Sequence, residues 1–270
     1  MKNLIFKSAL LVFLCAGITF GQGYLASAQK AVNKNKDIAG AFNLAKEAYS
    51  KDSINAAYVI LLLIKDKKND AELLDLLAKV CYKNGITENA IMYFQEADKL
   101  DSLNIERKFT LAEMFFKEQR YTDAVNEYLK VEKLDAKNKK ALENISSIFF
   151  RGKLYPAAAM YYEKVILLDK KLENYINCAI AFDSSKNFVK TLEIVKEGLK
   201  THPNNEVLAR KGFYAGVKSA QYEDALNLVI LIPDEKLSAY ETKTAGDIAA
   251  KLNIMIDDPD MRFRMRQNGL

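Results

Sequence analysis

The stretch AELLDLLAKVCYKNGITENAIMYFQEADKL, residues 71–100, decides the fold of this chain, because its apolar residues recur with the period of an α-helix. Apolar and small residues stand at i, i+3, i+4 and i+7 in its first half and at i, i+4 and i+7 in its second half. They are Leu74, Leu77, Ala78 and Cys81, followed by Ala90, Phe94 and Ala97. The stretch therefore predicts two helices, each with one apolar face, joined by a short turn at Gly85.

The pattern recurs at intervals of 34 residues, so the chain is a series of repeated units. With Ala71 as position 1, further units begin at Ile105, Lys139, Leu172 and Glu206, with a one-residue deletion before Leu172. A degenerate unit, Asp37 to Asp70, precedes them, with Ala56, Ile60 and Leu63 as the core residues of its second helix. Position 4 of the unit that begins at Ile105 is Lys108.

This register resembles the tetratricopeptide repeat family. The family pattern has a large residue at position 4, Leu and a small residue at 7 and 8, and an aromatic at 11. It continues with Gly near 15, Ala at 20, an aromatic at 24, Ala at 27 and Pro at 32. The chain departs from it at Thr191 (position 20) and at Gly212 and Gly216 (positions 7 and 11), and only Pro203 keeps the proline. The resemblance covers Asp37 to about Ile232.

The resemblance implies an all-α fold, a right-handed superhelical solenoid of antiparallel helix pairs with about six units. Pro156 falls at the start of a second helix and Pro233 after the last one, as helix termini require. A capping helix over Lys236–Asn253 then closes the solenoid, which spans residues 37–253. Residues 22–36 form an N-terminal lead-in and residues 254–270 a terminal tail, in which Met261–Arg266 alternates basic and apolar residues.

Residues 1–21 have the layout of a secretory signal peptide, with Lys2 and Lys7 before an apolar run from Ala9 to Phe20. The run is too short for a membrane-spanning helix, which needs about 20 residues. Cleavage before Gln22 or before Gln29 fits the small residues that follow, and we favour Gln22. Lipidation of Cys15 is the alternative, although Leu14 occupies the place where bacterial lipoproteins carry a small residue. We expect a periplasmic or cell-envelope protein, with secretion as a variant of the same route.

Composition argues against a nucleic-acid partner. The net charge of the chain is +5, and two of these charges lie in residues 1–21, which contain no acidic residue, so the remainder carries +3. Basic and acidic residues alternate along the units and do not form the concentrated basic face of nucleic-acid binders. Cys81 and Cys178 occupy core positions far apart in the register, so we expect free buried thiols.

The sequence predicts no catalytic, cofactor or metal site. His202, the single histidine, stands in an expected exposed turn beside Pro203, and no Gly-rich phosphate loop occurs. Gly212 and Gly216 are better explained by close helix packing. We therefore expect a non-enzymatic scaffold for protein–protein interaction. An envelope enzyme, of the glycosidase or peptidoglycan-processing kind, and a lipid-anchored assembly factor stay open as alternatives.

In the family, peptide ligands lie along the concave face and contact positions 2, 5, 9, 12 and 13 of the first helices. Positions 12 and 13 hold an aromatic and a basic residue in three successive units. The predicted partner-binding groove comprises Tyr82, Lys83, Phe109, Phe116, Lys117, Phe150, Arg151, Arg210, Tyr214 and Lys218. Such a groove should hold an extended or helical peptide with acidic and apolar residues.

Overall fold

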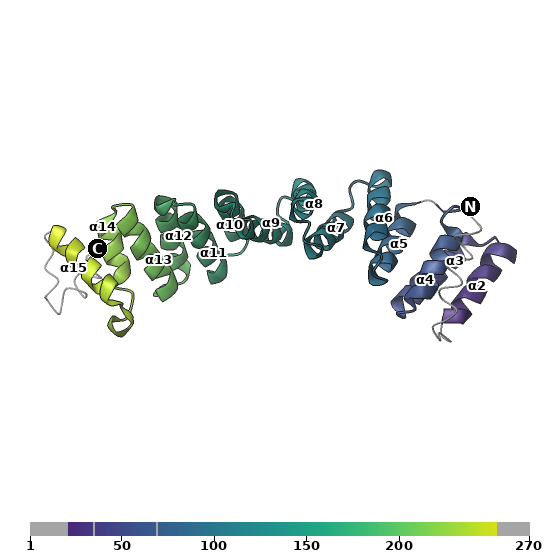
Figure 1. The fold of residues 1–270 in the computed structure, drawn as a ribbon, viewed down its shortest axis with the longest axis horizontal. Helices are drawn as coiled ribbons and strands as arrows, with labels where there is room; N and C mark the ends of the chain where they lie inside the picture. The colour runs from purple at the N-terminus through teal and green to yellow at the C-terminus, as the bar shows by residue number, and fades with distance from the viewer. Residues whose placement is uncertain (1–20, 35, 69, 253–270) are drawn as a thin grey trace. The chain divides into compact units, whose positions relative to one another are not determined.

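A computed structural model describes residues 21–34, 36–68 and 70–252 (Figure 1). These residues form fourteen α-helices and one 3₁₀ helix, and none of them lies in a strand. The helices up to residue 134 are α2 (Gly21–Lys34), α3 (Ile38–Ser50), α4 (Ile54–Ile64), α5 (Ala71–Lys83), α6 (Thr87–Leu100), α7 (Ile105–Lys117) and α8 (Tyr121–Leu134). The remainder are α9 (Lys139–Arg151), α10 (Tyr155–Leu168), α11 (Leu172–Ser184), α12 (Phe188–Thr201), α13 (Glu206–Lys218), α14 (Tyr222–Val229), the 3₁₀ helix η1 (Asp234–Lys236) and α15 (Ala239–Lys251).

The predicted repeat is confirmed by the helix boundaries. Helices α5, α7, α9, α11 and α13 begin at the first residue of the five regular units, and each is 13 residues long. The second helices are 14 residues long, except for α14, which has 8. The earlier unit also forms a helix pair, α3 and α4. The all-α class with antiparallel pairs therefore follows directly from the register.

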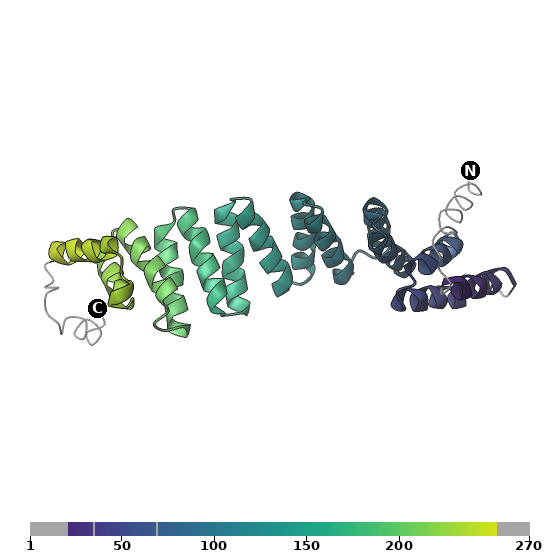
Figure 2. The ribbon, with the colours of Figure 1, turned by 60° about the horizontal axis from the view of Figure 1, so that its bottom comes forward.

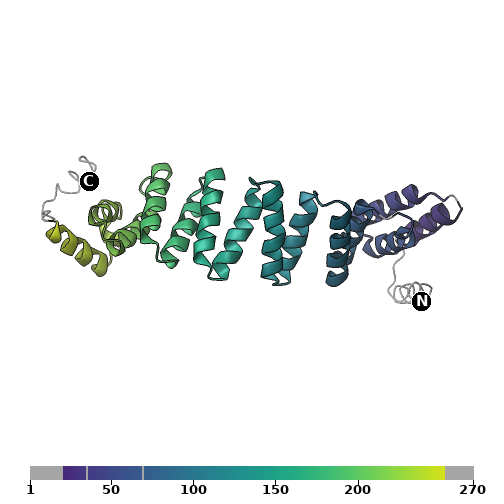
Figure 3. The ribbon, with the colours of Figure 1, turned by 90° about the horizontal axis from the view of Figure 1, so that it is seen from above.

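The chain divides into two compact units, unit 1 up to Met114 and unit 2 from Phe115, with the division inside α7. In unit 1, α2 packs on α3 and α4, and α5 packs on α6. In unit 2, each helix from α9 to α14 packs against the next one along the chain. Figures 2 and 3 show these helices side by side from two directions.

The turn within each unit has one backbone geometry throughout. The residue at position 15 has a positive φ of between 58° and 74° in all five regular units: Gly85, Gln119, Lys153, Lys186 and Ala220. The next amide donates back to the first helix, as from the Ile86 N to the Cys81 carbonyl at 2.9 Å and from the Leu154 N to the Phe149 carbonyl at 2.9 Å. This left-handed residue with its return hydrogen bond is a helix C-terminal motif that normally uses glycine. Here only Gly85 is a glycine.

The core follows the predicted stripes with few exceptions. Cys81 and Cys178 are buried free thiols, as expected, and burial raises the pKa of Cys81 to about 11. In the degenerate unit the expectation for Leu63 is wrong, because Ile64 is fully buried and Leu63 only half-buried. The whole unit is offset by one residue from its predicted start at Asp37, since α3 begins at Ile38 and the turn residue with positive φ is Asp52. In α13, Gly212 allows a close approach, since a Cβ there would lie 2.6 Å from Leu228 Cδ1.

Two terminal helices complete the described chain. The lead-in, for which the sequence predicted no element, contains α2. The capping helix exists but begins at Ala239 and not at Lys236, because Ser238 and Glu241 form a capping box that fixes its first turn. The predicted features of residues 1–20 and 253–270, including Cys15 and Met261–Arg266, lie outside the described residues.

Candidate functional site

Three predicted residue pairs at positions 12 and 13 share one arrangement. The aromatic residue is half-buried and the basic residue that follows it is exposed in Tyr82-Lys83, Phe116-Lys117 and Phe150-Arg151. The aromatic rings therefore contribute to packing while part of each stays accessible to solvent. What distinguishes the pairs is the partner that the basic group finds within the chain.

In unit 1 the basic groups of the first helices are paired with carboxylates. The Lys83 ammonium lies 3.2 Å from Asp52 Oδ1 and 4.8 Å from the centre of the Tyr49 ring. Lys79 donates to Glu106 at 3.0 Å, which joins α5 to α7. Phe109, the other predicted residue of this unit, is half-buried. The lysine charges on this face of unit 1 are thus paired with carboxylates of the same unit.

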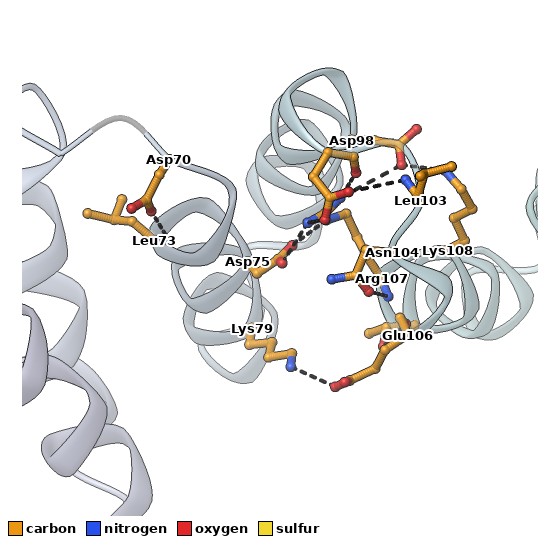
Figure 4. A network of polar contacts seen from close by, with 12 residues as sticks. Asp70, Leu73, Asp75, Lys79, Asp98, Leu103, Asn104, Glu106, Arg107 and Lys108 are labelled. Carbon is orange, nitrogen blue, oxygen red and sulfur yellow. Dashed lines mark hydrogen bonds and ion pairs between the residues drawn. The ribbon is translucent and has the colours of Figure 1, made fainter.

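A buried arginine extends this pattern into the interior of unit 1 (Figure 4). The Arg107 side chain is 1% exposed, and its Nε and Nη2 donate to the two oxygens of Asp75 at 2.6 and 2.9 Å. It also donates to the Asp101 carbonyl, while the neighbouring Lys108 pairs with Asp98. Burial disfavours the cation, but the hydrogen bond and charge of Asp75 outweigh it and raise the pKa of Arg107. This bidentate contact ties the start of α7 to α5.

In unit 2 the arrangement differs, because the Arg151 guanidinium lies over an aromatic ring. Its centre is 5.5 Å from the centre of the Phe116 ring. Within the described residues, Arg151 makes no ion pair. Phe150 is held edge-on against Tyr155 and Tyr162, at centroid distances of 5.4 and 6.4 Å. The exposed Arg151 guanidinium can donate hydrogen bonds to a carboxylate of a ligand. The rings of Phe116 and Phe150 beside it can contact an apolar side chain of the same ligand.

Half-buried aliphatic residues occupy ligand positions of the register on α11 and α13. Ile176 and Ile180 occupy positions 5 and 9 of α11, and Val217 occupies position 12 of α13. The Lys218 ammonium lies 3.2 Å from Asp183 Oδ1, so the C-terminal ends of α11 and α13 are in contact. We call Phe116, Phe150, Arg151, Ile176, Ile180 and Val217 the unit 2 face. The three aliphatic members were missed from the sequence, although they stand at ligand positions of the register.

Arg210 and Tyr214 make their contacts with the capping helix. The Glu241 carboxylate is completely buried and pairs with Arg210, and Tyr214 stacks on Tyr240 with an interplanar angle of 18°. Burial alone would raise the pKa of Glu241, but hydrogen bonds from the Ser238 amide and hydroxyl, from Arg210 and from Tyr214 lower it to about 2. The sequence predicted no buried carboxylate, and the Ser238–Glu241 capping box was the signal that could have shown it.

The remaining candidate positions give no further site. His202 caps α12 and is half-buried, not exposed as predicted, because its Nε2 lies 2.9 Å from the Lys170 carbonyl and its ring packs edge-on against Tyr175. Two shallow cavities of about 370 and 320 Å³ lie beside α14, and none of the predicted groove residues lines them. The part of the chain that the structure describes contains no metal-binding cluster of His, Cys, Asp and Glu. None of its helices combines the length and apolar character needed to cross a membrane.

Several solved structures resemble this chain. The MamA protein is 17% identical, with a TM-score of 0.51, over 69% of this chain and 95% of MamA. A structure of Naa15/Naa10 bound to HypK-THB is 13% identical, with a TM-score of 0.62, over 80% of this chain and 34% of that one. YrrB, a TPR protein with an unusual peptide-binding site, is 14% identical, with a TM-score of 0.48, over 68% and 96%. No protein-family model and no curated protein matches the chain. At sequence identities this low, the similarity shows a shared fold only. The function has to be inferred from the residues of this chain.

Proposed function

We propose that this chain, which has the tetratricopeptide-repeat fold, is a non-enzymatic scaffold that binds a segment of another polypeptide on the unit 2 face. The observation that carries the proposal is Arg151, an exposed cation that lies on Phe116 and makes no ion pair within the described residues. Arginine and aromatic residues dominate the binding energy of most protein interfaces. A structure that shares this fold was solved bound to HypK-THB, which supports a binding role.

The chemistry of the unit 2 face selects the ligand. Arg151 favours a carboxylate, which the planar guanidinium can bind through two hydrogen bonds. Phe150, Ile176, Ile180 and Val217 favour apolar side chains, because each keeps apolar surface exposed to solvent that a ligand can cover. We therefore expect a peptide that carries both acidic and apolar residues. The corresponding face of unit 1 is a weaker site, because Lys79 and Lys83 already have carboxylate partners.

The binding test starts from peptides selected from a displayed random library against the purified chain. Acidic and apolar residues should be enriched, and the affinity of a selected peptide is then measured by fluorescence anisotropy. Replacing Phe116, Phe150 and Arg151 together by alanine should weaken binding at least tenfold, about 1.4 kcal/mol. The matched control replaces Tyr82 and Lys83, the same register positions in unit 1, and should leave the affinity unchanged.

Melting curves of both variants exclude unfolding as the cause of lost binding. If the folded triple variant keeps its affinity for the peptide, the ligand does not bind the unit 2 face. If the unit 1 control loses as much affinity as the triple variant, binding is not specific to unit 2 and the proposal is wrong. A selection that enriches no acidic residues would contradict the role given to Arg151.

The same proposal places the scaffold in the cell envelope. Lys2, Lys7 and the apolar run from Ala9 to Phe20 support export, since a secretory signal has this layout. Fractionation of cells that express the full chain tests this part separately from binding. We expect the protein outside the cytoplasm with a shortened N-terminus, and an intact Met1 in the cytosolic fraction would contradict it.

A further inference from the structure

Helix α2 presents an apolar stripe that starts close to its first residue. Tyr24, Leu25 and Ala31 are half-buried, and Ala28 and Val32 are buried, at 0% and 4% exposure. These five positions have the spacing i, i+1, i+4, i+7 and i+8, which is one face of a helix. Ala26 and Ser27, in contrast, are exposed. Helix α2 therefore lies with a continuous face against other parts of unit 1.

The contacts of α2 show what this face covers. It packs against both α3 and α4, the helix pair of the first unit. The Tyr24 hydroxyl donates to Glu47 of α3 at 3.2 Å, and the Asp37 amide donates to the Ala31 carbonyl at 3.0 Å. A stack of helix pairs needs a terminal element that shields its first apolar face. Helix α2 occupies that place in unit 1.

This arrangement separates the two cleavage positions that the sequence leaves open. Cleavage after Ala28 would remove Tyr24, Leu25 and Ala28, three of the five residues of the stripe, and would leave only Gln29–Lys34 of α2. An α-helix of six residues has little stability of its own. Cleavage after Gly21 would leave the whole stripe in place.

We propose that the exported chain is processed by hydrolysis of the Gly21–Gln22 bond and that α2 stays in the mature protein as the N-terminal cap of unit 1. Water adds its hydroxyl to the Gly21 carbonyl and its proton to the Gln22 nitrogen as the bond breaks. The inference rests on the export part of the proposed function and is independent of the ligand.

The structural half of the proposal is tested with two purified chains, residues 22–270 and residues 29–270, which need neither export nor a ligand. The shorter chain should melt at least about 5 °C lower, because it loses most of the α2 face. Hydrogen exchange should be faster in α3 and α4 of the shorter chain and unchanged in α9 to α14. Equal melting midpoints for the two chains would overturn the role of α2 as a cap.

The processing half is tested by exporting the full chain from a bacterial host and measuring its N-terminus by mass spectrometry. The expected N-terminus is Gln22, and Gly21→Leu should block cleavage, since the residue before the bond must be small. Ala26→Leu is the matched control, because it removes the small residue required for cleavage after Ala28 at an exposed position of α2. It should leave processing unchanged. An N-terminus at Gln29, a chain that keeps Met1, lipid on Cys15, or loss of cleavage in Ala26→Leu would each overturn the proposal.

Discussion

Units 1 and 2 use the same repeat but join their first helices by different means. In unit 1, α5 and α7 are linked by the buried Arg107–Asp75 contact and by the Lys79–Glu106 pair. In unit 2, the face of α11 and α13 carries half-buried aliphatic side chains, with Lys218 and Asp183 at its edge. Among the described residues of this unit, Glu241 on the capping helix is the fully buried member of an ion pair. The register therefore fixes where helices meet and leaves open which chemistry joins them.

This difference has a consequence for binding. Groups that satisfy each other within the chain have little left to offer a ligand, whereas an unpaired cation and uncovered apolar surface gain from one. Position 13 is thus an internal ion pair at Lys83 in unit 1 and at Lys218 in unit 2, and a candidate ligand site at Arg151 in unit 2.

The largest effect is expected when the buried Arg107–Asp75 contact of unit 1 is removed. Arg107→Met leaves Asp75 and the Asp101 carbonyl without their donor and should destabilise unit 1 by about 4 kcal/mol, the range for removing one partner of a buried ion pair. Chemical denaturation gives the loss in the free energy of unfolding, and hydrogen exchange should locate it in α5 to α7. Lys79→Met is the matched control, since its pair with Glu106 is solvent-exposed, and it should cost at most about 0.5 kcal/mol. Similar costs for the two variants would mean that Arg107 is not what joins α5 to α7.

The repeat was predictable from the sequence because it depends on apolar spacing, which is local and recurs five times. The Arg107 contact was not, because it joins position 3 of one unit to position 5 of the preceding one, and only side-chain geometry shows that they meet. Lys108 at a core position was the visible clue that charge enters the interior here. Helix α2 was missed because it precedes the repeat and matches no unit in the register.

The sequence predicted the residues at positions 12 and 13 as groove residues, and their role in binding stays a prediction. In the structure each ring is half-buried and each base that follows it is exposed. The partners of the bases were not predictable: Lys83 finds Asp52, Arg151 finds Phe116, and Arg210 finds Glu241. Each partner lies on another helix, so the choice between an internal contact and a ligand site depends on packing that the sequence pattern does not encode.

The next largest effect is the loss of stability at low pH. It tests whether the buried carboxylate of unit 2, Glu241, stabilises only the C-terminal helix α15. The pKa of Glu241 is lowered from its ordinary 4.5 to about 2, so its ionised form stabilises the fold fully above pH 4.5. That stabilisation, about 3 kcal/mol, is lost as the pH falls from 4.5 toward 2. Hydrogen exchange should show α15 opening in this range before α9 to α12.

Glu241→Gln is the control for the acid prediction. It removes the titrating group while keeping the size of the side chain, so the variant should be less stable at neutral pH. The acid-dependent loss assigned to α15 should disappear in it. If α15 of the variant still opens between pH 4.5 and 2, another carboxyl is responsible and the assignment to Glu241 is wrong.

The smallest expected effect compares the same turn in the two units. Gly85 in unit 1 and Lys153 in unit 2 both stand at position 15 with positive φ, 74° and 58°, and both turns have the same return hydrogen bond of 2.9 Å. A residue with a Cβ is strained in this region by about 1 kcal/mol, and glycine is not. Lys153→Gly should therefore stabilise unit 2 by about 0.5 kcal/mol, the relief of strain exceeding the extra entropy of the unfolded glycine. Gly85→Lys should destabilise unit 1 by about 0.5 kcal/mol, because the same two terms act in the opposite direction. No heavy atom of the surrounding residues lies within 4 Å of a Cβ built at Gly85, so a steric clash cannot account for that loss.

Opposite shifts in the melting midpoint, a few degrees or less each, would show that the two turns are equivalent and differ only in the residue they use. Shifts of the same sign would show that the side chain of Lys153 makes a contribution that the backbone geometry does not account for.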